Sequence, residues 1–348
     1  MSEARDLLVE TATDLFTRTT PLVGRDSHNE AELGARIWKA VEQAELVTVG
    51  IEPNQGGVGG DFGDACAVLR SAARFAPPIP LAETQLAAWL ASEAGIEIPH
   101  GRLAVGPTSF GSLPRIGAGG AFDAALLHSV PFAGGVDTLV VLADHDGSPH
   151  VAVVSLADTV RVNALSLAGE PRASVALGGV RPTALAPFKP APGELLARGA
   201  LLRAQQIAGA LSRILELSVD YARARVQFGR PIARFQAVQH HLADIAAETV
   251  AAGIAAEAAA DLAESGWIAE AAMLAKSRTG LAGRAASVAH QVHGAIGVTE
   301  EHPLHLFTRR IWDWRDDFGS EVEWAGSLGR KVAQAGGAAL WAEVSEIA

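Results

Sequence analysis

Hydrophobic residues recur at helical spacing from the start of the chain to about residue 100. Leu8, Ala12 and Leu15 place one apolar face on a first helix. A glycine-rich connection, EPNQGGVGGDFGD at residues 52–64, follows, and Asp61 or Asp64 is placed to cap the next helix. This loop has no strand–GxGxxG–helix unit and no Walker lysine, so we interpret it as an ordinary connection.

The period changes between residues 103 and 188. The runs DTLVVLAD, HVAVVSL and VRVNAL are short and β-branched, and turn residues separate them. HDGSPH, at 145–150, is typical of a hairpin turn. Because no helical segments lie between these strands, the pattern predicts an antiparallel barrel or sandwich. The proline-rich stretch APFKPAPGE, at 186–194, predicts a linker.

Helical spacing returns at about residue 195 and continues to the end. The pattern predicts one helix ending near Arg225, a second over 235–265, a third over 267–292 and a fourth after Pro303. Long helices with short connections favour a four-helix bundle. The sequence therefore predicts a mainly α protein with a central β domain, divided into residues 1–102, 103–188 and 189–348.

Composition narrows the function classes for the 348 residues. The net charge is −11, which argues against nucleic acid as a partner. The single cysteine, Cys66, excludes an internal disulfide, and its apolar surroundings predict that it is buried. The apolar run 250–262 is short and interrupted by Glu257 and Asp261. No signal peptide is recognisable at the N-terminus, so we expect a soluble, cytoplasmic protein without a membrane partner.

Two segments carry candidate chemistry. RVQFGRPIARFQ presents one cation, Arg225, with amides at Gln227 and Gln236, and QVHGAIG at 291–297 combines an amide, an imidazole and exposed backbone N–H groups. Such donors suit a phosphate and ribose ligand, which points to a nucleotide cofactor. The alternative is that Arg225 pairs with a carboxylate and the amides are solvated. Adjacent His240 and His241 cannot both face one metal ion on a helix, so we predict no metal site.

These two segments, in YARARVQFGRPIARFQAVQHHLAD and HQVHGAIGVTEEHPLHLFTRR, resemble the acyl-CoA dehydrogenase family, and the resemblance covers nearly the whole chain. It implies an N-terminal helical domain, a middle β-barrel, a C-terminal four-helix bundle and an FAD at a subunit interface. It further implies that Arg225 binds the FAD pyrophosphate, with Gln227 and Phe228 beside it, and that Gln236 contacts FAD. The stretch implied to pack on the adenosine diphosphate portion is Gln291, Val292, His293, Gly294 and Ala295.

The family reaction needs a glutamate to remove the α-proton of an acyl-CoA thioester. By resemblance this base lies at one of two positions, which here are Phe318, nine residues after Arg309, and Gly199, 26 residues before Arg225. Neither can accept a proton, so no catalytic residue is predicted. Asp317 is a weak candidate because a shift of one residue rotates a helical side chain by about 100°.

The family's flavin-contacting patterns are also missing. Members that hold flavin in their own active site carry a TEP-type strand and a WIT-type segment in the middle domain. Residues 106–132 contain neither, and Thr108 is the nearest remnant. A threonine in such a turn is more often a local hydrogen bonder.

The leading hypothesis is therefore a catalytically silent subunit of a heteromeric acyl-CoA dehydrogenase. It resembles the shorter subunit of some actinobacterial α2β2 members that act on sterol side-chain CoA thioesters. A full-length partner subunit would supply the base, flavin pocket and acyl-CoA site. One FAD would be shared per heterodimer, with an electron-transfer flavoprotein or similar acceptor. The alternatives are a self-sufficient homomeric dehydrogenase that uses Asp317 as its base, and a structural subunit without flavin.

Overall fold

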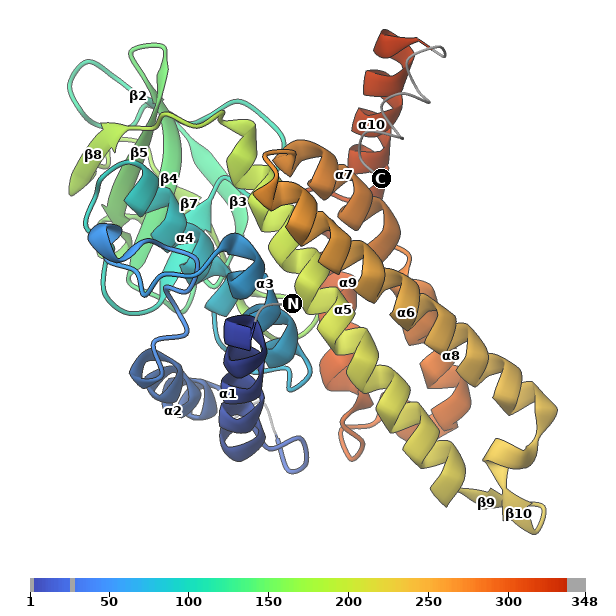
Figure 1. Ribbon diagram of the computed structural model, residues 1–348. Coiled ribbons are helices and arrows are strands. Elements are labelled where there is room, and N and C mark those ends of the chain that lie inside the picture. The colour runs from blue at the N-terminus through green and yellow to red at the C-terminus, as the bar shows by residue number, and fades with distance from the viewer. Residues whose placement is uncertain (1–2, 26–28, 337–348) are drawn as a thin grey trace.

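A computed structural model describes residues 3–25 and 29–336. The first part of the chain is helical (Figure 1). The side chain of Asp61 accepts a hydrogen bond from the backbone N–H of Asp64 and so caps α3. The side chain of Asp64 accepts one from the backbone N–H of Asp61, which completes a capping box. Cys66 is buried, as predicted. The helices are α1 (Glu3–Thr19), α2 (Glu30–Gln43), α3 (Phe62–Ala73) and α4 (Leu81–Glu93), with a 3-10 turn, η1 (Pro53–Gln55).

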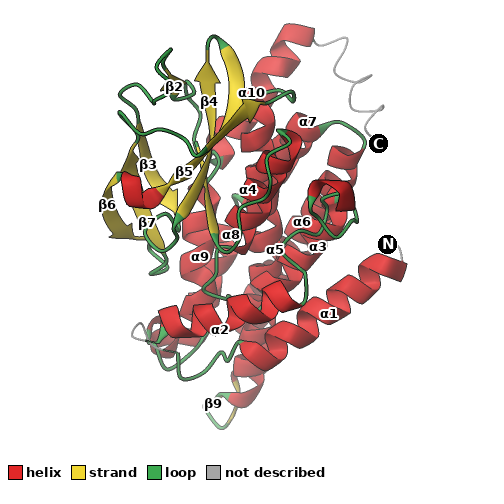
Figure 2. Cartoon of the chain, turned by 90° about the vertical axis from the view of Figure 1, so that its left-hand side faces the viewer, coloured by secondary structure: helices red, strands yellow, loops and turns green. Residues whose placement is uncertain are grey.

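The central region contains two sheets, which lie on one side of the helices in Figure 2. The first has the order β1–β4–β5–β8, with β2 also paired to β4, and the second has the order β3–β7–β6. The strands are β1 (Leu103–Gly106), β2 (Arg115–Ile116), β3 (Leu126–Pro131), β4 (Thr138–His145), β5 (Ser148–Ser155), β6 (Val160–Leu165), β7 (Pro171–Ala176) and β8 (Ala184–Pro187), with η2 (Leu156–Asp158) before β6.

The predicted hairpin at residues 145–150 is the β4–β5 turn, where His145 pairs with Ser148. Its turn residues Asp146 and Gly147 both have positive φ, as a type I′ turn requires. The pairing is not antiparallel throughout, because β1 and β2 both run parallel to β4.

The C-terminal part is a bundle built around α5, which packs on α6, α7, α8 and α9. Its elements are α5 (Gly193–Ala224), the hairpin strands β9 (Val226–Gln227) and β10 (Arg230–Pro231), η3 (Ile232–Arg234), α6 (Gln236–Glu264), α7 (Ile268–Thr279), α8 (Ala282–His293), η4 (Gly294–Val298), α9 (Leu304–Asp316) and α10 (Glu321–Ala335). These elements confirm the predicted fold class of a mainly helical protein with a central β region.

The predicted third helix is wrong in one respect, because it is divided into α7 and α8. The break falls at Gly280, where a Cβ atom would lie 2.4 Å from the side chain of Glu321 on α10. Tertiary packing of this kind is not visible in the helical spacing of the sequence. Within the described ranges, no helix combines the length and apolar character needed to cross a bilayer.

Candidate functional site

The β9–β10 hairpin carries the first predicted cluster at one end of the bundle. Its turn residues, Phe228 and Gly229, have φ values of 53° and 77°, which a two-residue type I′ turn requires. Left-handed backbone is costly for a phenylalanine and easy for glycine. The Phe228 side chain is nevertheless 91% exposed. The hairpin thus holds a largely exposed aromatic ring, which meets the ring of Phe235 edge-on with centroids 6.0 Å apart.

Arg225 lies where α5 meets this hairpin. Its backbone N–H donates to the carbonyl of Tyr221 at 2.8 Å, and its carbonyl accepts from the N–H of Ile232 at 2.8 Å. Its side chain is exposed, and no hydrogen bond or ion pair joins the guanidinium to any residue that the structure describes. Gln227 and Gln236 are exposed as well. The predicted donors therefore sit on a fixed backbone with their polar groups open to a ligand.

The second predicted cluster lies where α8 ends. Gln291, Gly294 and Ala295 are exposed, whereas Val292 and His293 are buried. Gly294 has φ 63° and ψ −142°, a conformation that a side chain would strain. Val292 packs in the hydrophobic core of the bundle. Three of the five predicted residues thus face outward, and the side chains of the other two point into the protein.

Tyr221 connects the two clusters and was not singled out from the sequence. Its ring stacks on that of His293, with centroids 4.6 Å apart and planes inclined by 22°, and it meets His302 edge-on at 5.9 Å. Burial lowers the pKa of His302 to about 4 and also lowers the pKa of His293. Both imidazoles are therefore neutral at pH 7 and serve as packing groups that hold the hairpin base against the end of α8.

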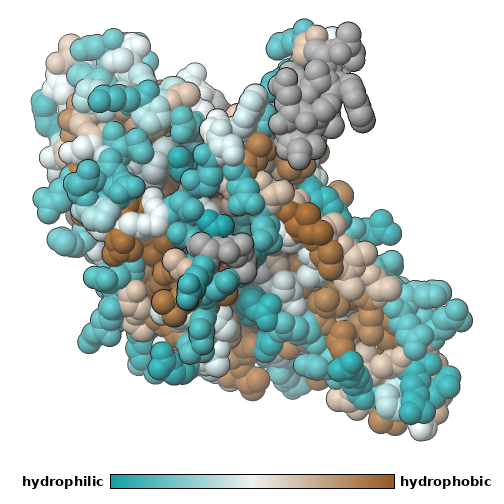
Figure 3. Space-filling view, viewed as in Figure 1, coloured by the Kyte–Doolittle hydropathy of each residue, from teal (hydrophilic) through white to brown (hydrophobic). Residues whose placement is uncertain are grey.

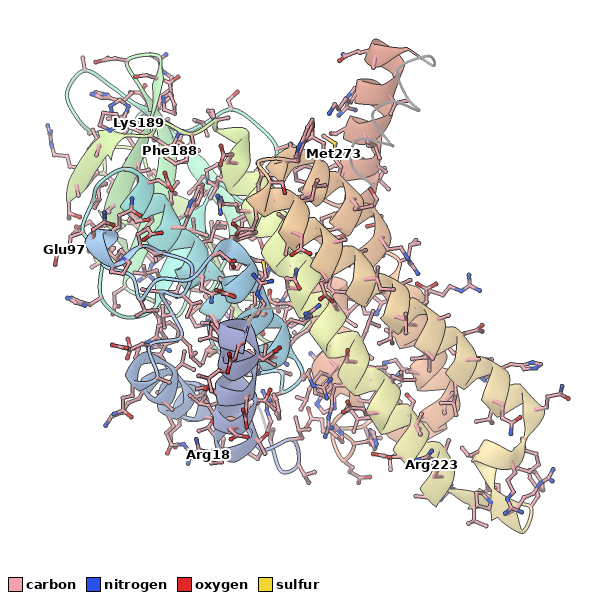
Figure 4. The ribbon with its side chains drawn as sticks, in the orientation of Figure 1. Arg18, Glu97, Phe188, Lys189, Arg223 and Met273 are labelled. Carbon is pink, nitrogen blue, oxygen red and sulfur yellow. The ribbon has the colours of Figure 1, made fainter. Side chains whose placement is uncertain are left out.

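The two predicted base positions lie far from this surface. Gly199 lies within α5 and Arg225 is its C-cap, 26 residues later, so the two are separated by roughly 39 Å along the helix axis. Figure 4 shows the two ends of the bundle: Arg223 lies beside the hairpin, while Met273 on α7 lies at the opposite end, near the β strands. This separation exceeds the length of an extended FAD, so the exposed cluster cannot reach a flavin placed beside Gly199 of the same chain.

Gly199 and Phe318 face each other directly. A Cβ atom on Gly199 would lie 2.2 Å from Cδ1 of Phe318, so the phenyl ring occupies the space where a side chain at position 199 would begin. Phe318 is 2% exposed. The fold thus brings both positions together and fills the space between them with an aromatic ring.

Three neighbouring groups fix the backbone at Phe318. Its N–H donates to the carbonyl of Thr108 at 3.1 Å, and its carbonyl accepts from Nε1 of Trp324 at 2.9 Å. A Cβ atom on Gly319 would lie 2.6 Å from the ring of Phe110. The remnant Thr108 therefore supports the segment that carries the phenyl ring.

Asp317, the weak candidate for a base, is buried in an ion-pair network. Its carboxylate accepts two bonds from Arg172, both 2.9 Å, and one from Nε of Arg203 at 3.1 Å. Burial alone would raise its pKa, but the charges of Arg203 and Arg172 hold the pKa below its usual value. A carboxylate held in this way is a poor proton acceptor.

The same network anchors the end of α9. Nζ of Lys276 donates to the carbonyls of Trp314, Arg315 and Asp317 at 3.1, 2.7 and 2.9 Å, which satisfies acceptors that a helix end leaves free. Arg203 also bonds to Glu83 on α4. The segment that leads into Phe318 is thus held by ion pairs and hydrogen bonds as well as by packing.

Space next to Gly199 is restricted on the side of α4. The cavity lined by Trp89, Arg198 and Leu202 measures about 20 Å³, which is room for one water molecule. The guanidinium of Arg198 lies 4.3 Å from the ring centroid of Trp89 and 4.9 Å from that of Phe62. No acyl chain fits there.

A larger apolar cavity lies on the other side, behind Phe110 and Trp324. It measures about 460 Å³ and is also lined by Met273. Its one carboxylate, Glu194, lies 3.9 Å from Arg198 in an ion pair. This cavity has room for an apolar group, but its lining carboxylate is paired and is not available as a base.

Four residues of the two regions were missed from the sequence: Tyr221, Arg172, Arg198 and Arg203. Tyr221 is the single tyrosine of the chain and lies four residues before Arg225, a helical spacing that could have drawn attention to it. Arg172 and Arg203 carry no such signal, because Asp317 and Glu83 lie far from them in the sequence, and the stacking partners of Arg198, Phe62 and Trp89, are also distant.

Comparisons with known proteins identify the family of the chain. The family model described as "Acyl-CoA dehydrogenase, C-terminal domain" matches residues 191–312. "Acyl-CoA dehydrogenase IpdE2" of Mycobacterium tuberculosis is 31% identical over 312 residues, covering 88% of this chain and 91% of that protein. The chain belongs to the acyl-CoA dehydrogenase family. Members of this family are oxidoreductases and are generally FAD-dependent.

Two solved structures share the whole architecture. A variant of the "Tcur3481-Tcur3483 steroid ACAD" has a TM-score of 0.83 at 25% identity, covering 96% of this chain and 98% of that chain. A chain of the "ChsE4-ChsE5 complex" from Mycobacterium tuberculosis has a TM-score of 0.84 at 21% identity, with the same coverage. The second likeness shows the fold alone.

Proposed function

We propose that this chain is the catalytically silent subunit of a heteromeric acyl-CoA dehydrogenase and that it contributes one surface to an FAD held by a full-length partner subunit. The observation that carries the proposal is the contact between Phe318 and Gly199. Both positions that would carry a base lack a carboxylate, and a phenyl ring fills the space between them. Asp317 is held by Arg172 and Arg203, which also argues against a self-sufficient enzyme.

The exposed cluster at the other end of α5 fits the diphosphate part of FAD. Arg225 has an unpaired guanidinium that suits two phosphate oxygens, Gln227 and Gln236 add amides, and Phe228 adds an aromatic face. Gln291, Gly294 and Ala295 provide a second surface with accessible backbone. FAD, when bound, supplies the hydride acceptor for α,β-dehydrogenation; the residues of this chain bind and orient it.

The partner in this proposal supplies the glutamate, the flavin cradle and the acyl-CoA site. Heteromeric assembly is supported by the first of the two solved structures, whose name, "Tcur3481-Tcur3483 steroid ACAD", joins two proteins. The same name contains the word steroid, which supports a sterol side-chain CoA thioester as substrate. An α2β2 assembly with one FAD per heterodimer and an electron-transfer flavoprotein as acceptor completes the proposal.

Exposed apolar side chains on the bundle are consistent with a protein partner. Figure 3 shows brown, hydrophobic atoms gathered along the helices between the hairpin and the β region. Val250 and Ile254 on α6 are 58% and 64% exposed, and Leu274 on α7 and Leu281, the N-cap of α8, are 43% and 52% exposed. Exposed apolar side chains gathered on one part of a surface are typical of an interaction site.

Substitution of Arg225 in the assembled complex tests the proposal. The chain is co-expressed with a full-length dehydrogenase subunit, and the flavin absorbance of the purified complex is measured per mole of protein. Arg225→Ala removes the diphosphate contact and is expected to weaken FAD binding by roughly tenfold or more, because bonds to charged groups are worth about 1.5–3 kcal/mol. Flavin should be lost on dialysis.

Arg36→Ala is the matched control, since Arg36 is an exposed arginine on α2. This variant should keep the flavin. If Arg225→Ala retains FAD as tightly as the wild type, this surface does not bind the cofactor and the structural-subunit hypothesis gains support. If the chain alone binds FAD and oxidises an acyl-CoA, the proposal is wrong and the homomeric alternative holds.

A further inference from the structure

A cavity of about 560 Å³ lies where the three parts of the chain meet. Its lining combines Arg25 and Arg102 from the N-terminal region, Phe132 and Leu165 from the sheets, and Arg309 from α9. None of its lining residues lines the two cavities beside Gly199 and Phe318. Cavities of this size at junctions between domains are common places for small ligands.

Two of the four arginines that line this cavity form ion pairs, and the other two do not within the described residues. Arg25 pairs with Glu30 at 2.7 Å, and Arg310 pairs with Glu170 at 2.8 Å. Arg102 is half-buried and makes no ion pair or side-chain hydrogen bond with any described residue. Arg309 uses Nε for the carbonyl of Leu167. Two guanidinium groups therefore keep free donors at the cavity.

Carboxylates and histidines near these donors do not neutralise them. Glu300 lines the cavity but is exposed and has no ion pair within the described ranges. His305 uses Nδ1 for the carbonyl of His302 at 2.9 Å. The electrostatic balance of the lining thus favours an anion, because a half-buried guanidinium without a partner has lost part of its hydration.

The remaining lining is apolar. Phe132 and Leu306 present buried hydrophobic groups, and Leu165, at the edge of the cavity, is 72% exposed. An apolar wall beside unpaired cations matches a ligand with an anionic head and a hydrophobic body. We infer that this cavity binds a carboxylate or phosphate group attached to an apolar chain or ring, with Arg102 and Arg309 on the anion and Phe132 and Leu165 on the apolar part.

Isothermal titration of the purified chain with three dodecyl probes tests this inference. Dodecanoate and dodecyl phosphate distinguish a carboxylate from a phosphate ligand, and dodecanol lacks the charge. At least one anionic probe is expected to bind. The affinity for dodecanol should be lower by roughly tenfold or more, since hydrogen bonds to charged groups are about twice as strong as neutral ones. Arg102→Ala should weaken binding of the anionic probe by a similar factor, and Leu165→Trp should weaken its binding because the larger side chain fills the cavity.

Arg36→Ala is again the control and should bind like the wild type. The inference is overturned if neither anionic probe binds at millimolar concentration, if dodecanol binds as tightly, or if Arg102→Ala and Leu165→Trp both bind like the wild type. The inference does not rest on the proposed function, and the flavin content of the complex is unaffected by either outcome.

Discussion

Gly199 and Phe318 occupy a shared space in which there is no room for a second side chain. A Cβ atom at position 199 would lie 2.2 Å from the phenyl ring, well inside van der Waals contact. Phe318 cannot withdraw easily, because its N–H and carbonyl are bonded to Thr108 and Trp324. The pair is therefore a packing unit, and in our proposal the absence of a base at these two positions is coupled to the stability of the fold.

Gly199→Ala is expected to destabilise the chain by about 1–3 kcal/mol through overpacking. Combining it with Phe318→Ala should recover part of that loss, because the clash disappears. Urea denaturation of the two single variants and the double variant measures the coupling. Gly253→Ala on α6 is the control: a Cβ atom there meets nothing within 4 Å, so this variant should be more stable by roughly 0.5–1 kcal/mol. Additive effects of Gly199→Ala and Phe318→Ala would show that the contact is not as described.

A second prediction at the residue scale concerns Asp317 and the pH dependence of the free energy of unfolding. Its folded-state pKa lies below the usual value, so its ionised form stabilises the fold above the unfolded pKa of about 3.9, and that stability is lost as the pH falls through the folded-state value. Asp317→Asn leaves Arg172 and Arg203 underpaired and should cost about 3–5 kcal/mol at pH 7.

The difference between wild type and Asp317→Asn should shrink as the pH falls below about 4, because the carboxylate is then protonated in the unfolded state while the fold still holds it ionised, until the pH passes through its lowered folded-state pKa. Asp316→Asn is the control, because the neighbouring Asp316 side chain is 61% exposed. A wild-type advantage that stays constant down to pH 2 would contradict the ion-pair account.

At the scale of elements, the hairpin between α5 and α6 is strained at Phe228, which has a positive φ and is 91% exposed. Phe228→Asn keeps the left-handed turn with a residue that favours it, so the lone chain should be equally or slightly more stable, by up to about 1 kcal/mol. The complex with a full-length subunit should nevertheless lose flavin more readily, because the exposed aromatic face is gone. Thermal unfolding of the chain and flavin retention by the complex measure the two effects.

Gly229→Ala provides the contrast within the same turn. Its φ is 77°, and a Cβ atom there meets nothing within 4 Å, so backbone strain alone should make this variant less stable. If Phe228→Asn destabilises the lone chain as much as Gly229→Ala, the phenylalanine has a structural role that we have not assigned to it.

Elements also show what the sequence could predict. The capping box at Asp61 and Asp64, the β4–β5 turn and the end of α5 near Arg225 depend on residues a few positions apart, and local spacing predicted them. The contacts of Arg172 with Asp317 and of Phe318 with Gly199 join residues more than 100 positions apart. Helical or strand spacing carries no information about such pairs, and the division of α7 from α8 at Gly280 depends on a similar distant contact with Glu321.

The site residues divide in the same way. The motif around Arg225 predicted exposed donors, and the structure brings them close to the end of α8 through Tyr221 and His293. The inward direction of Val292 and His293 could not be predicted from QVHGAIG, because it depends on the packing of α8 against α5.

At the scale of the whole molecule, two ends of one bundle have different roles in our account. The end near the β region carries the blocked base positions, and the hairpin end, roughly 39 Å away along α5, carries the surface for a cofactor. The central claim is that this surface serves a flavin whose chemistry belongs to another chain.

The ratio of FAD to protein in the purified complex tests that claim most directly. Flavin absorbance, with the two chains quantified separately, should give one FAD per heterodimer of this chain and a full-length subunit, and none in this chain when it is purified alone. Two FAD molecules per heterodimer, or an FAD bound by the chain alone, would contradict the account.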